Sequence, residues 1–275
     1  MKKISIIIPT LNSESYLEFS LKSIINQNYD NFEILIIDGG SKDKTLEIIK
    51  KYEKYISYFH SGKDKNMYDA INKGMKKING EIWAVLNSDD FYLNKNLFYF
   101  VNKTFEKNNE VDGISFNLVT INENNEIIKL KKRMKINYKN LLSFGHCTLM
   151  PQPGTFLKKQ IIDEIGYFDI NYDAASDYDY YLRILKNNYK IISSNIYSTA
   201  FRTHQAQITN TNSAKMNYER QAIIEKNKEF YSLNSIRKYY LYSIYFLKNK
   251  FTNTFTSQKT LKSLERYIKE LEEPK

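Results

Sequence analysis

The segment Glu81-Ile82-Trp83-Ala84-Val85-Leu86-Asn87-Ser88-Asp89-Asp90 decides the fold. Its first six residues predict a buried strand, which ends where four polar residues begin. Open α/β sheets bind ligands at the carboxyl ends of their strands, and two adjacent carboxylates there are costly unless a cation meets them. Oxygen ligands on a short turn suit Mg²⁺ or Mn²⁺, which would also hold a diphosphate. The alternative is a polar turn in which Asp caps the next helix.

The composition is that of a globular protein. The chain has 275 residues, of which 42% are hydrophobic and 26% are charged, and this suits one large domain or a domain with an appendage. The single cysteine, Cys147, excludes an internal disulfide and fits a reducing, cytoplasmic compartment. Pro9 interrupts the apolar run near the N-terminus, so we expect neither a signal peptide nor a membrane span there.

Residues 4–90 alternate between apolar runs and helical patterns. Strands are predicted at Ile4–Ile8, Phe32–Ile37 and Tyr55–Phe59, before the strand described above. The helical patterns between them are a helix capped by Ser13, a helix that ends at Tyr52 and a helix from Met67 to Lys77. This alternation predicts an α/β fold with a parallel sheet wound by right-handed crossovers.

Polar residues follow each of these strands. Because parallel strands end at one edge of the sheet, we expect Thr10, Asn12, Asp38, Asp64 and Asp89 to gather there. Carboxylates accept hydrogen bonds from ribose hydroxyls and base N–H groups, and a cation bridges other acids to phosphates. Each acid alone is an ordinary cap or turn residue, but their succession predicts a nucleotide site. Neither the dinucleotide motif G-x-G-x-x-G nor a P-loop occurs.

The second half of the chain follows a different pattern. A helix is predicted from Leu97 to Lys107, followed by strands at Val111–Val119 and Glu126–Leu130 that we expect to be antiparallel. The turn-rich segment Pro151–Phe156 leads into a short strand and a helix that ends at Ile165.

Two acids open the next predicted helix, where helix capping alone would account for them. Asp179 lies four residues before Arg183, so these two side chains are expected to pair. Asp177 points to a different face of the helix. It is therefore the freer candidate for a general base.

The segment Phe201–Thr209 is predicted to be a loop that holds Arg202 and His204. Both side chains suit contact with a diphosphate, and an imidazole also suits a metal ion. The alternative is a loop whose polar residues are simply solvated.

Residues 210–275 form a basic extension that reads as helices from Ser213 onward. It holds 13 Lys or Arg and 7 Asp or Glu residues, a difference of +6 within a net charge of +10. The stretch Phe230–Phe251 interleaves aromatic residues with basic ones, and such a segment can lie on an anionic membrane surface. A helix packed on the domain, a homodimer contact and a solvated basic face are the alternatives.

Five stretches together resemble glycosyltransferase family 2, which has the GT-A fold. They are Ser5–Asn12, Ile37–Thr45, Asp64–Gly74, Leu86–Asp90 and Ala175–Arg183. They occur in the family's order over roughly residues 3–209 and look most like the branch that assembles bacterial O-antigen and capsular polysaccharides. The resemblance implies a mixed, mainly parallel sheet in a domain of residues 1–209. Residues 1–90 would be its nucleotide-binding half, 91–209 its acceptor half, and 210–275 a helical extension.

The resemblance also implies an inverting transfer of a sugar from a nucleotide-diphosphate donor, usually UDP-linked, to a glycan or lipid-linked glycan. Asp177 falls at the position of the catalytic base, and the D-x-D position places Asp89 on Mn²⁺ or Mg²⁺, with His204 as the second expected ligand. The residues expected at the donor are Pro9, Thr10, Asn12, Asp38, Gly39, Ser41, Asp64, Lys73, Asn87, Ser88 and Arg202. The sequence departs from the family at Asn87, which replaces an acid, and at Ser176, where many relatives have Glu.

Two other functions compete with this one. A sugar nucleotidyltransferase also uses a parallel sheet and Mg²⁺. Enzymes of that class have a Gly-rich basic loop directly after the first strand, whereas this chain has Pro9-Thr10-Leu11-Asn12-Ser13 there. A non-catalytic module that binds a nucleotide sugar or a membrane is the second. We expect no nucleic-acid partner, because no motif supports one.

Overall fold

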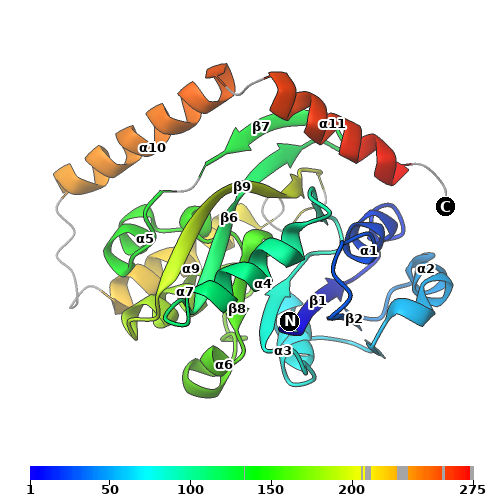
Figure 1. Cartoon of the computed structure of the whole chain (residues 1–275). Coiled ribbons are helices and arrows are strands. Elements are labelled where there is room, and N and C mark those ends of the chain that lie inside the picture. The colour runs from blue at the N-terminus through cyan, green and yellow to red at the C-terminus, as the bar shows by residue number, and fades with distance from the viewer. Residues whose placement is uncertain (133, 206, 208–211, 228–234, 256–257, 273–275) are drawn as a thin grey trace.

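The computed structural model describes residues 1–132, 134–205, 207, 212–227, 235–255 and 258–272. In these residues nine strands form one sheet with helices on both faces (Figure 1). The strand order is β3-β2-β1-β4-β8-β6-β9-β5, and β7 pairs with β6. The predicted mixed sheet flanked by helices is confirmed.

The first half of the chain is the parallel part of the sheet. Its strands are β1 (Ile4–Thr10), β2 (Phe32–Asp38), β3 (Tyr58–Ser61) and β4 (Ile82–Val85), and its helices are α1 (Leu17–Ile25), α2 (Thr45–Lys51) and α3 (Met67–Met75). The unbroken apolar run of β1 arises because both of its faces are covered. Ile7 packs in the cluster that includes α3, whereas Ile6 and Ile8 pack in the cluster that includes α1.

The second half is mixed in direction. It comprises β5 (Phe91–Tyr92), α4 (Leu97–Lys107), β6 (Gly113–Ile121), β7 (Ile127–Lys131), α5 (Tyr138–Phe144), β8 (Thr155–Lys158), α6 (Gln160–Ile165), α7 (Ser176–Lys186) and β9 (Ile191–Arg202), with the short 3₁₀ turns η2 (Cys147–Leu149) and η3 (Gln152–Gly154). A further 3₁₀ turn, η1 (Glu53–Tyr55), lies in the first half after α2. The predicted antiparallel pair is confirmed as β6 and β7. Strand β8 runs antiparallel to β4, so its start lies at the edge where β4 ends.

The part of the chain described after β9 is helical from Ser213 onward, as predicted, and comprises α9 (Ser213–Lys226), α10 (Ser235–Phe255) and α11 (Gln258–Glu272). Helix α10 lies beside α5 and β7, and α11 packs beside α1 (Figure 1). The buried side chains of α11, such as Leu264 and Ile268, join Phe91 and Ala200 of the sheet in one apolar cluster. None of the described helices is long and apolar enough to cross a membrane.

The structure corrects several predicted details. Strand β3 begins three residues later than expected, because η1 continues the turn after α2 up to Tyr55. Ser13 does not cap α1 with its side chain: its carbonyl accepts from the backbone N–H of Leu17 at 3.0 Å, while its hydroxyl bonds to Ser88 Oγ at 2.7 Å. Strands β5 and β9 were not predicted, and the expected loop from Phe201 begins inside β9.

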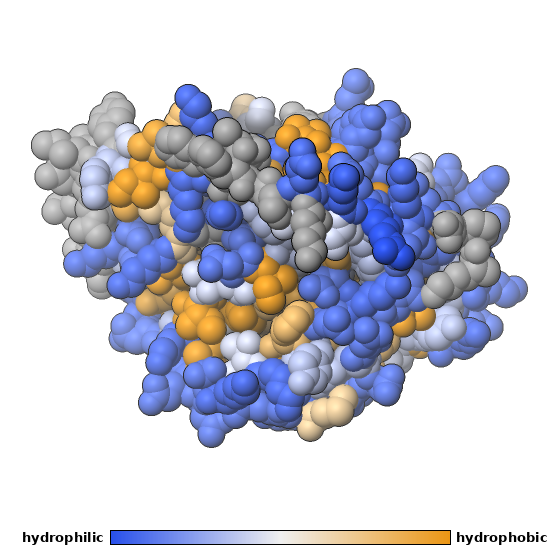
Figure 2. Space-filling model, turned by 45° about the horizontal axis from the view of Figure 1, so that its top comes forward, coloured by the Kyte–Doolittle hydropathy of each residue, from blue (hydrophilic) through white to orange (hydrophobic). Residues whose placement is uncertain are grey.

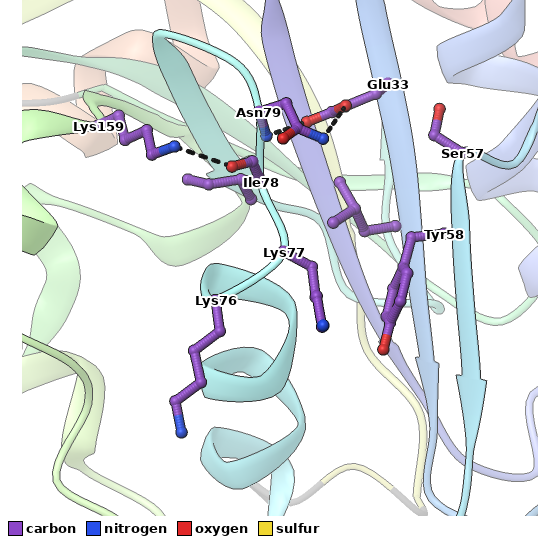
Figure 3. A pocket seen from close by; sticks show the side chains of 9 residues that line it. Glu33, Ser57, Tyr58, Lys76, Lys77, Ile78, Asn79 and Lys159 are labelled. Atoms are coloured by element: carbon purple, nitrogen blue, oxygen red, sulfur yellow. Dashed lines mark hydrogen bonds between the residues drawn. The ribbon is translucent and has the colours of Figure 1, made fainter.

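A cavity opens at the amino-terminal edge of the sheet, away from the strand ends that carry the predicted residues (Figure 3). Its volume is about 470 Å³, and its lining includes Lys76, Lys77, Lys159 and Glu33. The negative charge of Glu33 is balanced by Lys3, whose Nζ lies 2.7 Å from the carboxylate, and the carboxylate also accepts from the backbone N–H of Asn79 at 2.6 Å. None of the residues expected at the donor or the base lines this cavity.

Candidate active site

The loops after β1 and β2 are tied together at the carboxyl edge of the sheet. Asn12 adopts a left-handed backbone with φ 47°. Its backbone N–H donates to Ser41 Oγ at 2.8 Å, and its side-chain oxygen accepts from the N–H of Lys42 at 2.9 Å. Thr10 is buried at the end of β1. These bonds fix the walls of the edge at which we expect the nucleoside.

Asp38 organises this edge from within. Its side chain is fully buried and accepts from the N–H groups of Gly40 and Ser41, both at 3.1 Å, from Ser61 Oγ at 2.6 Å and from the hydroxyl of Ser41. Gly40 takes a positive φ of 88°, which a side chain disfavours. These bonds hold the carboxylate of Asp38 in place at the edge where we expect the nucleoside.

Asp64 lies at the next strand end and is held by Lys73 of α3. Lys73 Nζ lies 2.5 Å from Asp64 Oδ1 and 3.3 Å from Asp69 Oδ2. A Cβ on Gly39 would come within 3.3 Å of Asp64 Oδ2, so the loop after β2 passes directly over this carboxylate. The two loops and α3 therefore meet at Asp64.

The adjacent acids after β4 have different surroundings. Asp90 is completely buried and accepts from Asn87 Nδ2 at 3.1 Å and from the N–H of Arg202 at 3.0 Å. Burial, and next the charge of Asp89, raise the pKa of Asp90 well above its usual value. Asp89 is partly exposed, and its Oδ2 lies 3.0 Å from His204 Nε2. Asp90 thus supports the loop, and Asp89 faces the site.

Arg202 lies in the interior of the domain, behind the loop that carries Asp89. Its side chain is fully buried at the end of β9, where it donates to the carbonyl of Asp89 at 3.1 Å and to Asn125 Oδ1 at 2.7 Å. Its guanidinium also stacks on Tyr16 at 4.4 Å from the ring centroid. The guanidinium therefore holds the loop of Asp89 from behind, while its Nη2 has no hydrogen-bond partner among the described residues. That Arg202 contacts a diphosphate stays a prediction.

His204 lies beside Asp89, the other residue expected at the metal. Its ring lies 5.3 Å from that of Tyr16, and its Nε2 faces Asp89. An imidazole nitrogen and a carboxylate at this spacing fit a divalent ion that takes its other ligands from a diphosphate and water. Among the described residues no group of three His, Cys, Asp or Glu side chains has the geometry of a metal site. Asn87 Oδ1 is buried beside the two acids without a hydrogen-bond partner in the described structure.

Asp177 lies at the start of α7, as predicted. Its Oδ1 accepts from the N–H of Tyr178 at 2.8 Å and from the hydroxyl of Tyr68 at 3.3 Å, and the thiol of Cys147 donates to it as well. Burial raises the pKa of Asp177 above the usual value of a carboxyl group, and these donors oppose the rise. The predicted pairing of Asp179 with Arg183 is confirmed, because Arg183 Nε lies 2.8 Å from Asp179 Oδ2. Arg183 is therefore paired with Asp179 and not with Asp177.

Sequence reasoning missed the groups that surround Asp177. Tyr68 belongs to the apolar stripe of α3, and Cys147 was considered only as a possible disulfide partner. Arg220 of α9 is the third, since its charge lowers the pKa of Asp177. No local pattern in the sequence marks these residues, because they come from segments far apart along the chain.

Comparisons with known proteins identify the family of this chain. Residues 5–166 match the family model described as Glycosyl transferase family 2. An uncharacterized glycosyltransferase of Rickettsia typhi is 30% identical over 76% of this chain and 66% of its own length. A dolichyl N-acetyl-alpha-D-glucosaminyl phosphate 3-beta-D-2,3-diacetamido-2,3-dideoxy-beta-D-glucuronosyltransferase of Methanococcus voltae is 31% identical over 73% of this chain and 67% of its own length. The chain thus spans about two thirds of these relatives.

Solved structures give the same architecture. S. aureus TarS in complex with UDP-GlcNAc superposes with a TM-score of 0.68 at 17% identity, over 98% of this chain and 80% of that one. The mannosyltransferase PcManGT of Pyrobaculum calidifontis, solved with GDP-Man and Mn²⁺, gives a TM-score of 0.59 at 13% identity, over 96% and 86% of the two chains. At these identities the likeness concerns the fold.

Proposed function

The chain belongs to glycosyl transferase family 2 and has the GT-A fold, and we propose that it transfers a sugar from a UDP-linked donor, with inversion, to a hydroxyl of a growing surface glycan. The observation that carries the proposal is the pairing of Asp89 with His204 at the carboxyl edge of the sheet, together with Asp177 at the start of α7, which is partly buried and forms no salt bridge among the described residues. A TarS structure with UDP-GlcNAc supports the choice of nucleotide.

The chemistry assigns separate tasks to the two groups. A sugar hydroxyl is a poor nucleophile, so Asp177 takes its proton as the oxygen attacks C1 of the donor sugar. The bond from C1 to the diphosphate breaks on the opposite face, and this inverts the anomeric centre. Asp89 and His204 would hold Mn²⁺ or Mg²⁺, which supplies positive charge for the departing diphosphate.

The acceptor and the cellular location of the protein are part of the same proposal. The relative from Methanococcus voltae is named for a dolichyl-phosphate-linked sugar, and this supports a lipid-linked glycan of the O-antigen or capsule kind. Helix α10 exposes Phe246 and Leu247 and carries Lys250. On the face shown in Figure 2, hydrophobic side chains form separate patches among hydrophilic ones. We therefore place the protein peripherally on the inner face of the cytoplasmic membrane.

A thermal-shift panel tests the donor and the metal. UDP, GDP and their sugars are added to the full chain with and without Mn²⁺, because a ligand that binds only the folded state raises the melting temperature. We expect the largest shift with UDP or a UDP-sugar, and a smaller one when Mn²⁺ is left out. A larger shift with GDP compounds would change the donor, and no shift with any nucleotide would overturn the proposal.

A further inference from the structure

Helix α9 is clamped onto the segment that precedes α7. Glu219 is buried, and its carboxylate accepts three backbone N–H groups: those of Asp173 and Ala174 at 2.9 Å and that of Ala175 at 3.0 Å. Charge-assisted bonds of this kind are stronger than neutral ones. The clamp fixes the next residue of α9, Arg220, relative to the start of α7.

The side chain of Arg220 lies on the buried face of α9. That face also carries Met216, Ile223 and Ile224 at helical spacing, and Ile223 and Ile224 pack in the same cluster as Tyr178 of α7. Arg220 is partly buried, and its Nε is buried without a hydrogen-bond partner in the described parts of the chain. Such a donor is costly unless a ligand satisfies it.

The groups around Arg220 belong to the base side of the site. Burial raises the pKa of Asp177 and of Cys147, and the positive charge of Arg220 opposes both rises. Burial also raises the pKa of Tyr242 of α10, and Arg220 opposes that rise. Tyr242 is 37% exposed and donates to the carbonyl of Phe144 at 2.8 Å. The clamp of Glu219 on residues 173–175 and these charge effects together place Arg220 on the side of the proposed base, with Tyr242 of α10 as a further neighbour.

We infer that Arg220 binds an anionic group, a phosphate or a carboxylate, that the acceptor carries next to the attacking hydroxyl. The inference rests on the proposed function and names the class of acceptor. The planar guanidinium presents paired donors that match the oxygens of both groups. Because Arg220 adjoins Asp177 and not the pair of Asp89 and His204, the anion it meets belongs to the acceptor side.

A bound anion would also act on the base. The groups that face Asp177 come from α3, η2, α7 and α9 and are Tyr68, Cys147, Tyr181 and Arg220. Arg220 is the only cation among these four, so an anion that offsets its charge would raise the pKa of Asp177. A carboxylate with a higher pKa takes a proton more readily.

The test measures binding of small probes to the full chain saturated with UDP and Mn²⁺. The probes are N-acetylglucosamine 1-phosphate, glucuronate and neutral N-acetylglucosamine, titrated into the wild type, Arg220→Gln, Arg220→Lys and the control Arg266→Gln. Arg266 is largely exposed on α11, so its variant loses the same charge far from the base. We expect the charged probes to bind better than the neutral one, and Arg220→Gln to lose about tenfold or more of that affinity.

Each outcome decides the matter. Arg266→Gln should behave as the wild type, and Arg220→Lys should keep part of the affinity because it keeps the charge. The stronger of the two charged probes tells phosphate from carboxylate. Equal binding of charged and neutral probes by the wild type would overturn the inference while leaving the UDP response, and with it the proposed function, intact. Weaker UDP binding in Arg220→Gln would assign the residue to the donor and also overturn it. If Arg220→Gln does not fold, the wild type and Arg220→Lys decide.

Discussion

At the scale of single residues, Asp177 is the position on which turnover should depend most. Asp177→Asn keeps the shape of the side chain but removes the base, so we expect turnover to fall by about 10²–10⁴-fold. The UDP-induced thermal shift should persist, because the donor edge is built by other loops. Turnover is measured by release of UDP from the donor sugar in the presence of acceptor.

Asp179→Asn is the matched control for this change, because the residue lies on the same helix and pairs with Arg183 at 2.8 Å. It should lower the melting temperature and retain turnover. Loss of UDP binding in Asp177→Asn would contradict a purely chemical role for that carboxylate.

Cys147 should tune the pH dependence of the same base. Its thiol donates to Asp177 and lowers the pKa of that carboxyl, against the rise that burial causes. Cys147→Ala removes the donor, so the pKa of Asp177 rises and the acidic limb of the kcat/KM profile moves to higher pH. Cys147→Ser keeps a donor and should leave the limb near that of the wild type. A limb that does not move in Cys147→Ala would exclude this coupling.

The adjacent acids after β4 should separate binding from stability. Asp89→Asn leaves the buried network in place, so the melting temperature should hold while the Mn²⁺-dependent part of the UDP shift disappears. Asp90→Ala leaves the backbone N–H of Arg202 without its acceptor and should cost about 1–3 kcal/mol of unfolding free energy, measured by urea denaturation. The reverse pattern, with Asp90 controlling the metal response, would contradict our assignment of the two carboxylates.

At the scale of elements, the contact between α3 and β1 sets the position of two site residues. A Cβ on Gly74 would lie 2.6 Å from Ile7 Cγ2, so only glycine allows the helix to come this close. Gly74→Ala should displace α3, which carries Tyr68 and Lys73, and destabilise the fold by about 1–3 kcal/mol. Lys76→Ala, just beyond the end of α3, is the control and should change stability little. Unchanged urea midpoints in Gly74→Ala would show that the sheet accommodates the methyl group.

The sequence predicts elements well where local pattern and burial agree. Strands β1, β2 and β4 are continuous apolar runs because helices cover both of their faces. Strand β9 was missed because it runs through polar residues, among them Ser193, Ser198 and Thr199, of which Ser198 and Thr199 are buried in the sheet. Its register with β6 is decided by tertiary pairing, and no local window contains that information.

The same limit applies to the candidate site. The positions of Asp38, Asp64 and Asp89 could be predicted from the ends of the strands, because the carboxyl ends of parallel strands lie at one edge of the sheet. The sequence did not reveal which of these acids are already satisfied, since the partners of Asp38 and the buried contacts of Arg202 depend on loops that meet only in the folded chain. Arg202 was a ligand candidate because of its charge, and the sequence did not show that its side chain is buried behind the loop of Asp89.

At the scale of the whole molecule, charge and exposed apolar side chains together predict association with a membrane surface. The chain carries a net charge of +10, and Phe246 on α10 is 65% exposed. We expect the protein to sediment with vesicles rich in phosphatidylglycerol, to leave neutral vesicles unbound, and to dissociate as salt is raised. Phe246→Glu places a negative charge on the contact and should weaken binding to the anionic vesicles.

Phe100→Glu separates this local effect from the change in net charge, because Phe100 is an exposed phenylalanine on α4, a different helix. The two variants carry the same charge. If α10 makes the contact, only Phe246→Glu loses vesicle binding beyond the small loss that one added negative charge causes. If both variants bind equally, the attraction is spread over the basic surface, and α10 serves chiefly to cover α5 and β7, against which it packs.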